Sequence, residues 1–191
     1  MKQRIFIAIN LPREIKEVLG DFQNKYPELP ARWTKPENNH ITLIFIGYAD
    51  EQEILEIKQV VQNIILRYKP FSIALDKISY GPPKIMPPRM VWALGPLPKE
   101  FLNLKNDLQK ELAEKIRFMP EKRETVLHIT LARIKEWEWR KIEPEERPQV
   151  DENIDLKFAV NSIELMKSVL KRGGPEYKIL QSYNLKPAGR P

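Results

Sequence analysis

The tetrapeptide His-Ile-Thr-Leu occurs twice in this chain of 191 residues, at positions 40–43 and 128–131. The only two histidines of the chain, His40 and His128, open the two copies. Self-similar segments with matching surroundings are the signature of an internal repeat, and coincidence explains them poorly. The duplication therefore favours a fold that is built from two related halves.

The segments around the two copies follow the same order of strand, helix and strand. The distance from Arg4 to His40 is 36 positions, which nearly equals the 39 positions from Arg89 to His128. The apolar patterns predict helices that begin near Pro12, Asp50 and Pro98. They predict strands at residues 4–9, 40–46, 71–80, 90–94, 127–134, 156–166 and 176–185. The charged stretch 135–153 is expected to be an exposed loop or a short helix.

We therefore expect one α+β domain over residues 1–191 that consists of two pseudo-symmetric lobes. Each lobe would carry an antiparallel sheet with outer helices, and the lobes would share strands around a central cleft. The first motif near 40–43 would belong to one lobe and the second motif near 128–131 to the other. Two α+β halves that share this order by chance are the alternative.

Composition narrows the class of protein. At 42% hydrophobic residues the chain can form a packed core, and the absence of Cys excludes disulfide scaffolds, thiol nucleophiles and Cys-ligated metals. No apolar run approaches the roughly 20 residues that span a bilayer, and the apolar stretch at the N-terminus is too short for a signal peptide. We expect a soluble, cytoplasmic monomer. Its net charge of +6 is compatible with an RNA partner without requiring one.

Strand geometry groups the polar side chains of each motif on one face. Because side chains alternate along a strand, His40 and Thr42 point the same way, as do His128 and Thr130. If the halves face each other, one imidazole can take a proton from a nucleophile while the other protonates a leaving oxygen. The threonine hydroxyls can donate hydrogen bonds to phosphoryl oxygens as charge develops there. This arrangement favours attack on a phosphodiester.

A structural role and a zinc site are weaker alternatives for the histidines. A lone His on a strand is usually structural, but two histidines in identical His-x-Thr settings reverse that expectation. Zinc sites need three or four protein ligands. The chain has no Cys, and no neighbouring carboxylate stands in helix or strand register with either histidine. We therefore expect no metal and no cofactor.

At these residues the sequence resembles the 2H phosphoesterase superfamily, which is named for its paired His-x-Thr/Ser-x motifs. It is most similar to the bacterial and archaeal RNA 2′,3′-cyclic phosphodiesterases, also called 2′-5′ RNA ligases. The resemblance covers nearly the whole chain. The segments that carry it are residues 4–9, 33–47, 88–92, 128–133, 163–168 and 174–177.

The resemblance implies a bilobal α+β fold and metal-independent opening of a terminal 2′,3′-cyclic phosphate to a 2′-phosphate, with some members also joining RNA ends. By the family pattern, His40 is the proton donor to the leaving 3′ oxygen and His128 is the proton acceptor that activates water. The residues alone leave these two roles interchangeable, because the motifs are identical. Thr42 and Thr130 would hold the phosphate. The chain departs from the family at Leu127, where a Pro is common.

Two arginines are candidate substrate contacts. Arg133 closes the second motif segment, as in the family, and an arginine suits a phosphate. Strict alternation places the Arg133 side chain on the face of the strand opposite to that of His128. Arg133 therefore reaches the site only if the strand twists or bulges. Arg89, at the end of a Pro-rich loop, is the second candidate, and a surface salt bridge is the alternative for each. Aromatic residues that could stack on a base are Trp33, Tyr48, Tyr80 and Trp92.

The leading hypothesis is an enzyme that acts on RNA with a 2′,3′-cyclic phosphate end, tRNA fragments included. A second hypothesis keeps the chemistry but changes the substrate to a small cyclic nucleotide. A third is a non-catalytic RNA- or nucleotide-binding module, although binding alone does not need an acid/base pair.

Overall fold

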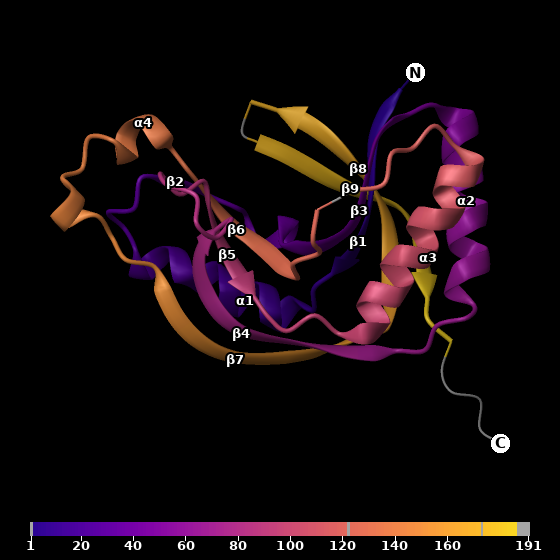
Figure 1. Cartoon of the computed structure of the whole chain (residues 1–191), viewed down its shortest axis with the longest axis horizontal. Helices are drawn as coiled ribbons and strands as arrows, with labels where there is room; N and C mark the ends of the chain where they lie inside the picture. Colours follow the sequence, from indigo (N-terminus) through magenta and orange to yellow (C-terminus); the bar gives the residue numbers. More distant parts are fainter. Residues whose placement is uncertain (1, 122, 173, 187–191) are drawn as a thin grey trace.

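Antiparallel pairing organises the whole chain. The computed structural model describes residues 2–121, 123–172 and 174–186, and within these ranges nine strands form one sheet (Figure 1). The strands are β1 (Gln3–Asn10), β2 (Ala31–Trp33), β3 (His40–Ala49), β4 (Phe71–Gly81), β5 (Met90–Leu94), β6 (His128–Ile134), β7 (Asp151–Val160), β8 (Ser162–Lys171) and β9 (Gly174–Asn184). The helices are α1 (Arg13–Asp21), α2 (Glu51–Ile65), α3 (Lys99–Lys115) and the short α4 (Glu136–Trp139). Single 3₁₀ turns lie at Phe22–Lys25, Pro36–Asn38 and Pro144–Glu146.

The order of the strands reflects the internal repeat. It runs β7-β4-β5-β6-β3-β1-β8-β9, with the short β2 paired to β6. The two motif strands, β3 and β6, are therefore neighbours at the centre, with three strands beyond each of them. A single antiparallel pair, Ile41 with Ile129, joins the two halves. The α+β antiparallel class expected from the sequence is confirmed, and the sheets expected for the two lobes are joined into one.

The prediction of one strand over residues 156–166 is wrong. Asn161 separates β7, which pairs with β4, from β8, which pairs with β1 in the other half of the sheet. The sequence hides this break because Val160 and Ile163 are both buried, so the apolar pattern continues across it. The stretch 135–153 contains α4 and a 3₁₀ turn before β7 begins at Asp151, and β2 was not predicted.

The three predicted helices are observed and cover the sheet with apolar faces. In α2, Asp50 and Glu53 form the capping box: the Asp50 carboxylate accepts from the Glu53 N–H at 3.0 Å, and the Glu53 carboxylate accepts from the Asp50 N–H at 3.0 Å. Helices α2 and α3 lie side by side (Figure 1) and bury Ile57, Leu104 and Leu108 completely. None of the described helices has the length and apolar character needed to cross a bilayer.

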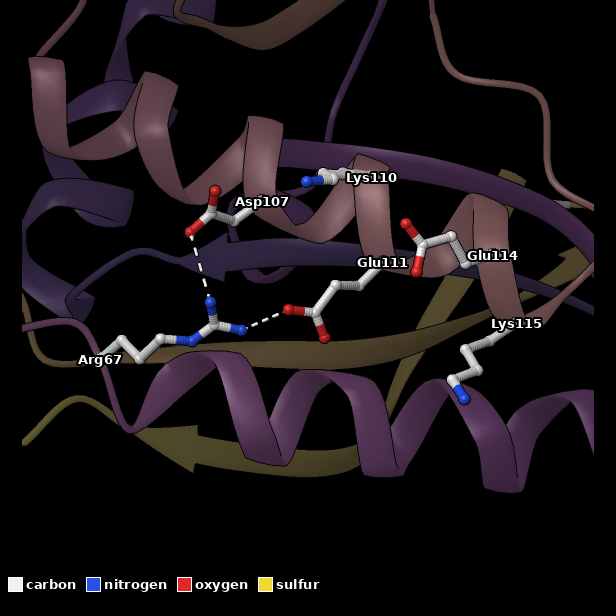
Figure 2. Close-up of a pocket in the computed structure, with 6 residues that line it drawn as sticks. All are labelled: Arg67, Asp107, Lys110, Glu111, Glu114 and Lys115. Carbon is white, nitrogen blue, oxygen red and sulfur yellow. Dashed lines mark hydrogen bonds and ion pairs between the residues drawn. The ribbon is translucent and has the colours of Figure 1, made fainter.

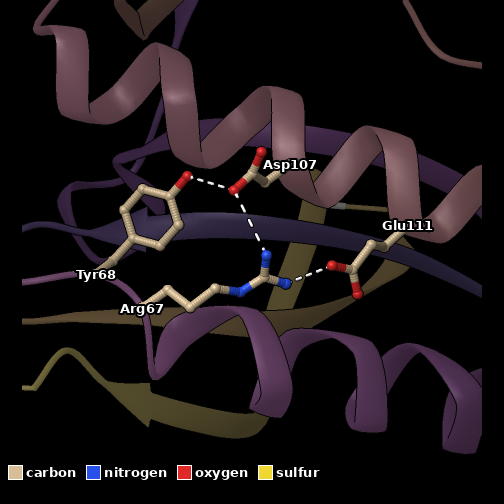
Figure 3. Close-up of polar contacts among 4 residues, drawn as sticks. All are labelled: Arg67, Tyr68, Asp107 and Glu111. Carbon is tan, nitrogen blue, oxygen red and sulfur yellow. Dashed lines mark hydrogen bonds and ion pairs between the residues drawn. The ribbon is translucent and has the colours of Figure 1, made fainter.

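A charged cluster connects the end of α2 to α3. A surface depression at this place is lined by six charged residues, Arg67, Asp107, Lys110, Glu111, Glu114 and Lys115 (Figure 2). The Tyr68 hydroxyl donates to Asp107 at 2.8 Å, and the Arg67 guanidinium bridges Asp107 and Glu111 (Figure 3). The depression draws no residue from β3 or β6. We therefore assign the cluster to helix–helix packing rather than to the chemistry of the motifs.

Candidate active site

The two motifs meet at the centre of the sheet. Ile41 and Ile129 form the joining pair and are buried in the core. The polar motif residues, His40, Thr42, His128 and Thr130, are half-buried on the opposite side, which we call the motif face. Because β3 and β6 are antiparallel around Ile41 and Ile129, His40 is on the side of Thr130, and Thr42 is on the side of His128. Two imidazoles and two hydroxyls thus surround one point between β3 and β6.

Each imidazole is held by a backbone carbonyl two residues before it. His40 Nδ1 lies 2.7 Å from the Asn38 carbonyl oxygen, and His128 Nδ1 lies 2.9 Å from that of Val126. A carbonyl oxygen only accepts hydrogen bonds, so Nδ1 carries the proton and donates in both rings. In each neutral imidazole Nε2 then keeps its lone pair. Nε2 of His40 lies 3.1 Å from the Thr42 hydroxyl.

Different aromatic rings cover the two imidazoles. His40 meets Tyr177 edge-on at 4.9 Å between ring centroids and lies 5.1 Å from Phe6. His128 stacks on Trp92 at 4.1 Å with the ring planes 26° apart. Because this apolar cover disfavours the charged form, burial lowers the pKa of both imidazoles below the usual 6.5. Burial therefore favours the neutral form of both imidazoles.

A lysine forms hydrogen bonds with the segment that precedes each motif histidine. The buried Lys105 of α3 donates to the Thr125 hydroxyl at 3.0 Å and to Glu121 at 3.5 Å, in the segment that leads into β6. Lys16 of α1 donates to the Glu37 carbonyl oxygen at 3.0 Å, in the segment that leads into β3. Each lysine thus holds the segment that presents a histidine.

A β-bulge follows each motif threonine. The β1–β3 register shifts at Leu43, and the β5–β6 register shifts at the equivalent Leu131. After each bulge two successive residues are buried, Leu43 with Ile44 and Leu131 with Ala132. Alternation is therefore displaced by one residue beyond this point.

The displaced alternation brings Arg133 onto the motif face. This is the condition that the sequence required for Arg133 to reach the site. The equivalent position in β3 is Phe45, which is 63% exposed and packs 6.2 Å from Phe6. The sequence reasoning missed Phe45, although its place five residues after His40, as Arg133 follows His128, was a readable signal.

The other predicted substrate contacts, Arg89 and the aromatic residues, lie at different places in the structure. Arg89 is exposed, and its carbonyl accepts from the Ile134 N–H at 2.9 Å, but no described contact joins its side chain to the motif residues. Tyr80 packs on Trp139 and donates to the Pro148 carbonyl at 2.6 Å. Trp33 packs against the core and Tyr48 is exposed. Among the candidate aromatic residues, Trp92 is the one in contact with a motif histidine.

Leu127, where the sequence departs from the family that it resembles, has a place in the core. Leu127 is 1% exposed, so it anchors the start of β6 through burial. In the part of the chain that the structure describes, no group of three His, Cys, Asp or Glu side chains is arranged to hold a metal ion.

Comparison with known proteins identifies the family. The family model of LigT-like phosphoesterases matches residues 7–92 and 94–177. A Thermotoga maritima protein named RNA 2′,3′-cyclic phosphodiesterase is 31% identical over 182 residues, which cover 93% of this chain and 92% of the relative.

Solved structures agree with this assignment. The Thermus thermophilus protein TT0787 superposes with a TM-score of 0.82 at 27% identity, covering 97% of this chain and 100% of that one. Escherichia coli LigT, crystallised with 3′-AMP, gives a TM-score of 0.78 at 25% identity, covering 97% and 99%. The chain therefore belongs to the LigT-like phosphoesterases of the 2H superfamily, and the hydrolase expected from its duplicated motif is confirmed.

Proposed function

We propose that this protein opens the 2′,3′-cyclic phosphate at the end of an RNA to a 2′-phosphate by acid/base catalysis between His40 and His128. The observation that carries the proposal is the pair of imidazoles on one face, each with Nδ1 bound to a carbonyl, so that Nε2 is the nitrogen that can transfer a proton. Nε2 of His40 has the Thr42 hydroxyl beside it. The name of the Thermotoga maritima relative supports the same substrate.

The reaction uses one proton transfer at each histidine. Nε2 of His128 takes a proton from water, and the water oxygen attacks the phosphorus. The bond from phosphorus to the 3′ oxygen breaks, and His40, which enters the reaction as the doubly protonated imidazolium, gives its Nε2 proton to that oxygen. Thr42 and Thr130 donate hydrogen bonds to the non-bridging oxygens as negative charge develops there. The direction, with His40 as donor, follows the family pattern, and a 5′-hydroxyl in place of water would give 2′-5′ ligation.

A turnover assay in EDTA tests this proposal. The substrate is a short RNA that ends in a 2′,3′-cyclic phosphate, and the product is separated as 2′- or 3′-phosphate. We expect a 2′-phosphate product that EDTA does not suppress, and about 100- to 10,000-fold lower kcat in His40→Ala and His128→Ala. Lys110→Gln on α3 is the control variant, since its side chain lies outside the motif face.

The outcomes separate the three hypotheses. Loss of turnover in EDTA would contradict the metal-independent mechanism. Turnover restricted to a cyclic mononucleotide would favour the small-nucleotide phosphodiesterase, and E. coli LigT has been crystallised with the mononucleotide 3′-AMP. A folded protein that binds RNA but turns over no cyclic phosphate would be a binding module.

A further inference from the structure

Three arginines from three strands surround Tyr177 on the motif face. They are Arg4 of β1, Arg32 of β2 and Arg133 of β6. Arg4 and Tyr177 both pair with Ser168 of β8, from its two sides, and Arg32 lies beside Gly174 at the start of the strand that carries Tyr177. Burial raises the pKa of the Tyr177 phenol, and the positive charges of Arg133, Arg4 and Arg32 oppose that rise. The Tyr177 ring itself contacts His40. Tyr177 therefore contacts His40 and also lies near the three arginines.

Two of these arginines are direct cross-strand neighbours. Arg32 and Arg133 are opposite each other in the β2–β6 pair. Like charges placed opposite each other on adjacent strands destabilise a sheet. Both side chains are exposed, and neither forms a salt bridge with a residue that the structure describes. By contrast, Arg67 and Arg140 each have a carboxylate partner. Anions bound beside Arg32 and Arg133 would relieve their repulsion.

Arg32 places positive charge at some distance from the two motif histidines. A Cβ atom on Gly174 would lie 3.9 Å from Cζ of Arg32, so the guanidinium sits at the turn between β8 and β9. The Asn38 side chain donates to the Pro175 carbonyl at 3.0 Å, which ties the same turn to the segment before His40. Arg32 thus lies at the border of the motif face.

Arg4 is the second arginine that lies near Tyr177 without a place beside the histidines. Alternation along β1 puts Arg4 on the same face as Phe6, which contacts both His40 and Tyr177. Arg4 is exposed and pairs with Ser168 of β8 in the sheet. Along β1, Arg4 lies six residues from Asn10, which pairs with His40, and Arg32 pairs with Arg133, five residues after His128. An anion at Arg4 or Arg32 is therefore a different anion from the phosphate that reacts at the histidines.

We propose that Arg32 and Arg4 bind the backbone phosphates of the nucleotides that precede the cyclic phosphate, so that the enzyme selects an oligonucleotide over a mononucleotide. The inference rests on the proposed function and adds the substrate class to it. Arginine suits this role because its planar guanidinium can bind phosphate oxygens through two parallel hydrogen bonds. Contacts of this kind are independent of base sequence.

Comparison of two substrates tests the inference. One is 2′,3′-cyclic AMP and the other is a tetranucleotide that ends in a 2′,3′-cyclic phosphate. In Arg32→Gln we expect the ratio of kcat/KM for the tetranucleotide to kcat/KM for the mononucleotide to fall about tenfold, through KM. The logarithm of kcat/KM for the tetranucleotide should also depend less steeply on the logarithm of salt concentration, by about 0.7 for each lost phosphate contact.

One control variant and one double variant complete the test. Lys110→Gln makes the same change in charge on α3 and should leave both the ratio and the salt dependence as in the wild type (Figure 2). Arg4→Gln combined with Arg32→Gln should lower the ratio further than either change alone. Circular dichroism and thermal unfolding show whether each variant is folded.

The failures of the two proposals are distinguishable. A wild-type protein that turns over neither substrate would overturn the proposed function. A wild-type protein that is active on both, with a ratio unchanged in folded Arg32→Gln and in the double variant, would overturn only the backbone-binding site. An equal loss on both substrates would also overturn it, since Arg32 would then act on the terminal nucleotide.

Discussion

The two motif histidines share their backbone hydrogen bonds but differ in what surrounds their rings. His40 is enclosed by Tyr177 and Phe6, whereas His128 lies flat on Trp92. Burial lowers the pKa of both imidazoles below 6.5. The proposed reaction needs one protonated and one neutral imidazole. The fraction of free enzyme in that state is largest between the two lowered pKa values.

We therefore expect the pH profile of kcat/KM to be bell-shaped with its maximum below about pH 6.5. As pH rises, the donor loses its proton and activity falls; as pH drops, the acceptor becomes protonated and activity falls again. Residual activity of His40→Ala should lack the alkaline limb, and that of His128→Ala should lack the acidic limb. A maximum above about pH 8 in the wild type would contradict these assignments.

Lys105 is expected to position His128 and to contribute to its lowered pKa. Burial lowers that pKa most, the Val126 carbonyl and Glu121 raise it, and the positive charge of Lys105 lowers it further. Lys105→Met removes the positive charge and leaves Glu121, so the pKa of His128 should rise. Because the chain has two histidines, ¹H NMR titration can follow both, with His40 as the internal reference. An unchanged or lower pKa of His128 would contradict the role of Lys105.

At the scale of elements, the two bulges decide which side chains reach the motif face. Each bulge follows a motif threonine and shifts the alternation by one residue. Arg133 and Phe45 consequently occupy equivalent places in β6 and β3, one charged and one aromatic. This difference breaks the pseudo-symmetry of the site.

We expect Arg133→Gln to lower kcat/KM about 100-fold on both the mononucleotide and the oligonucleotide, because Arg133 lies on the same face as the reacting phosphate. Arg133→Lys should recover part of the loss, since it restores the charge without the planar fork. Phe45→Leu is the matched change at the equivalent position in β3. It should affect KM more than kcat. Wild-type activity in folded Arg133→Gln would show that the bulge does not present this side chain to substrate.

At the scale of the whole molecule, the narrow junction between the two halves of the sheet lies beneath the motif residues. Ile41 and Ile129 form the one residue pair between β3 and β6 among the described strands, and both are buried in the core. The same pair sets the spacing of the two histidines. Stability of the junction and geometry of the site therefore depend on the same two side chains.

Ile129→Ala should lower the free energy of unfolding by about 2–5 kcal/mol, and the matched Ile129→Val by about 0.5–1.5 kcal/mol, because each leaves a cavity in a packed core. Urea denaturation followed by tryptophan fluorescence and by far-UV circular dichroism measures both. We expect one transition with coincident midpoints, since the halves share a sheet. Two separate transitions would indicate halves that unfold independently.

The sequence by itself determined the local features of this protein. Apolar alternation and helical periodicity are local patterns, so they predicted the strands and helices, and they placed each motif His and Thr on one face. The Asp50 capping box is also local, and the helix begins next to Asp50 as predicted. The duplicated tetrapeptide predicted two related halves, and it is the basis of the proposed acid/base pair, because the same four residues occur twice in the chain.

The tertiary structure alone decided the features that depend on pairing between distant strands. The bulge at Leu131 turns Arg133 toward the motif face, and only its register with β5 reveals that shift. The break at Asn161 exists because β7 and β8 pair in opposite halves of the sheet. Arg32 and Arg133 are 101 positions apart in the chain and become neighbours through β2 and β6. Register between strands is set by non-local packing, which a pattern read along one chain does not contain.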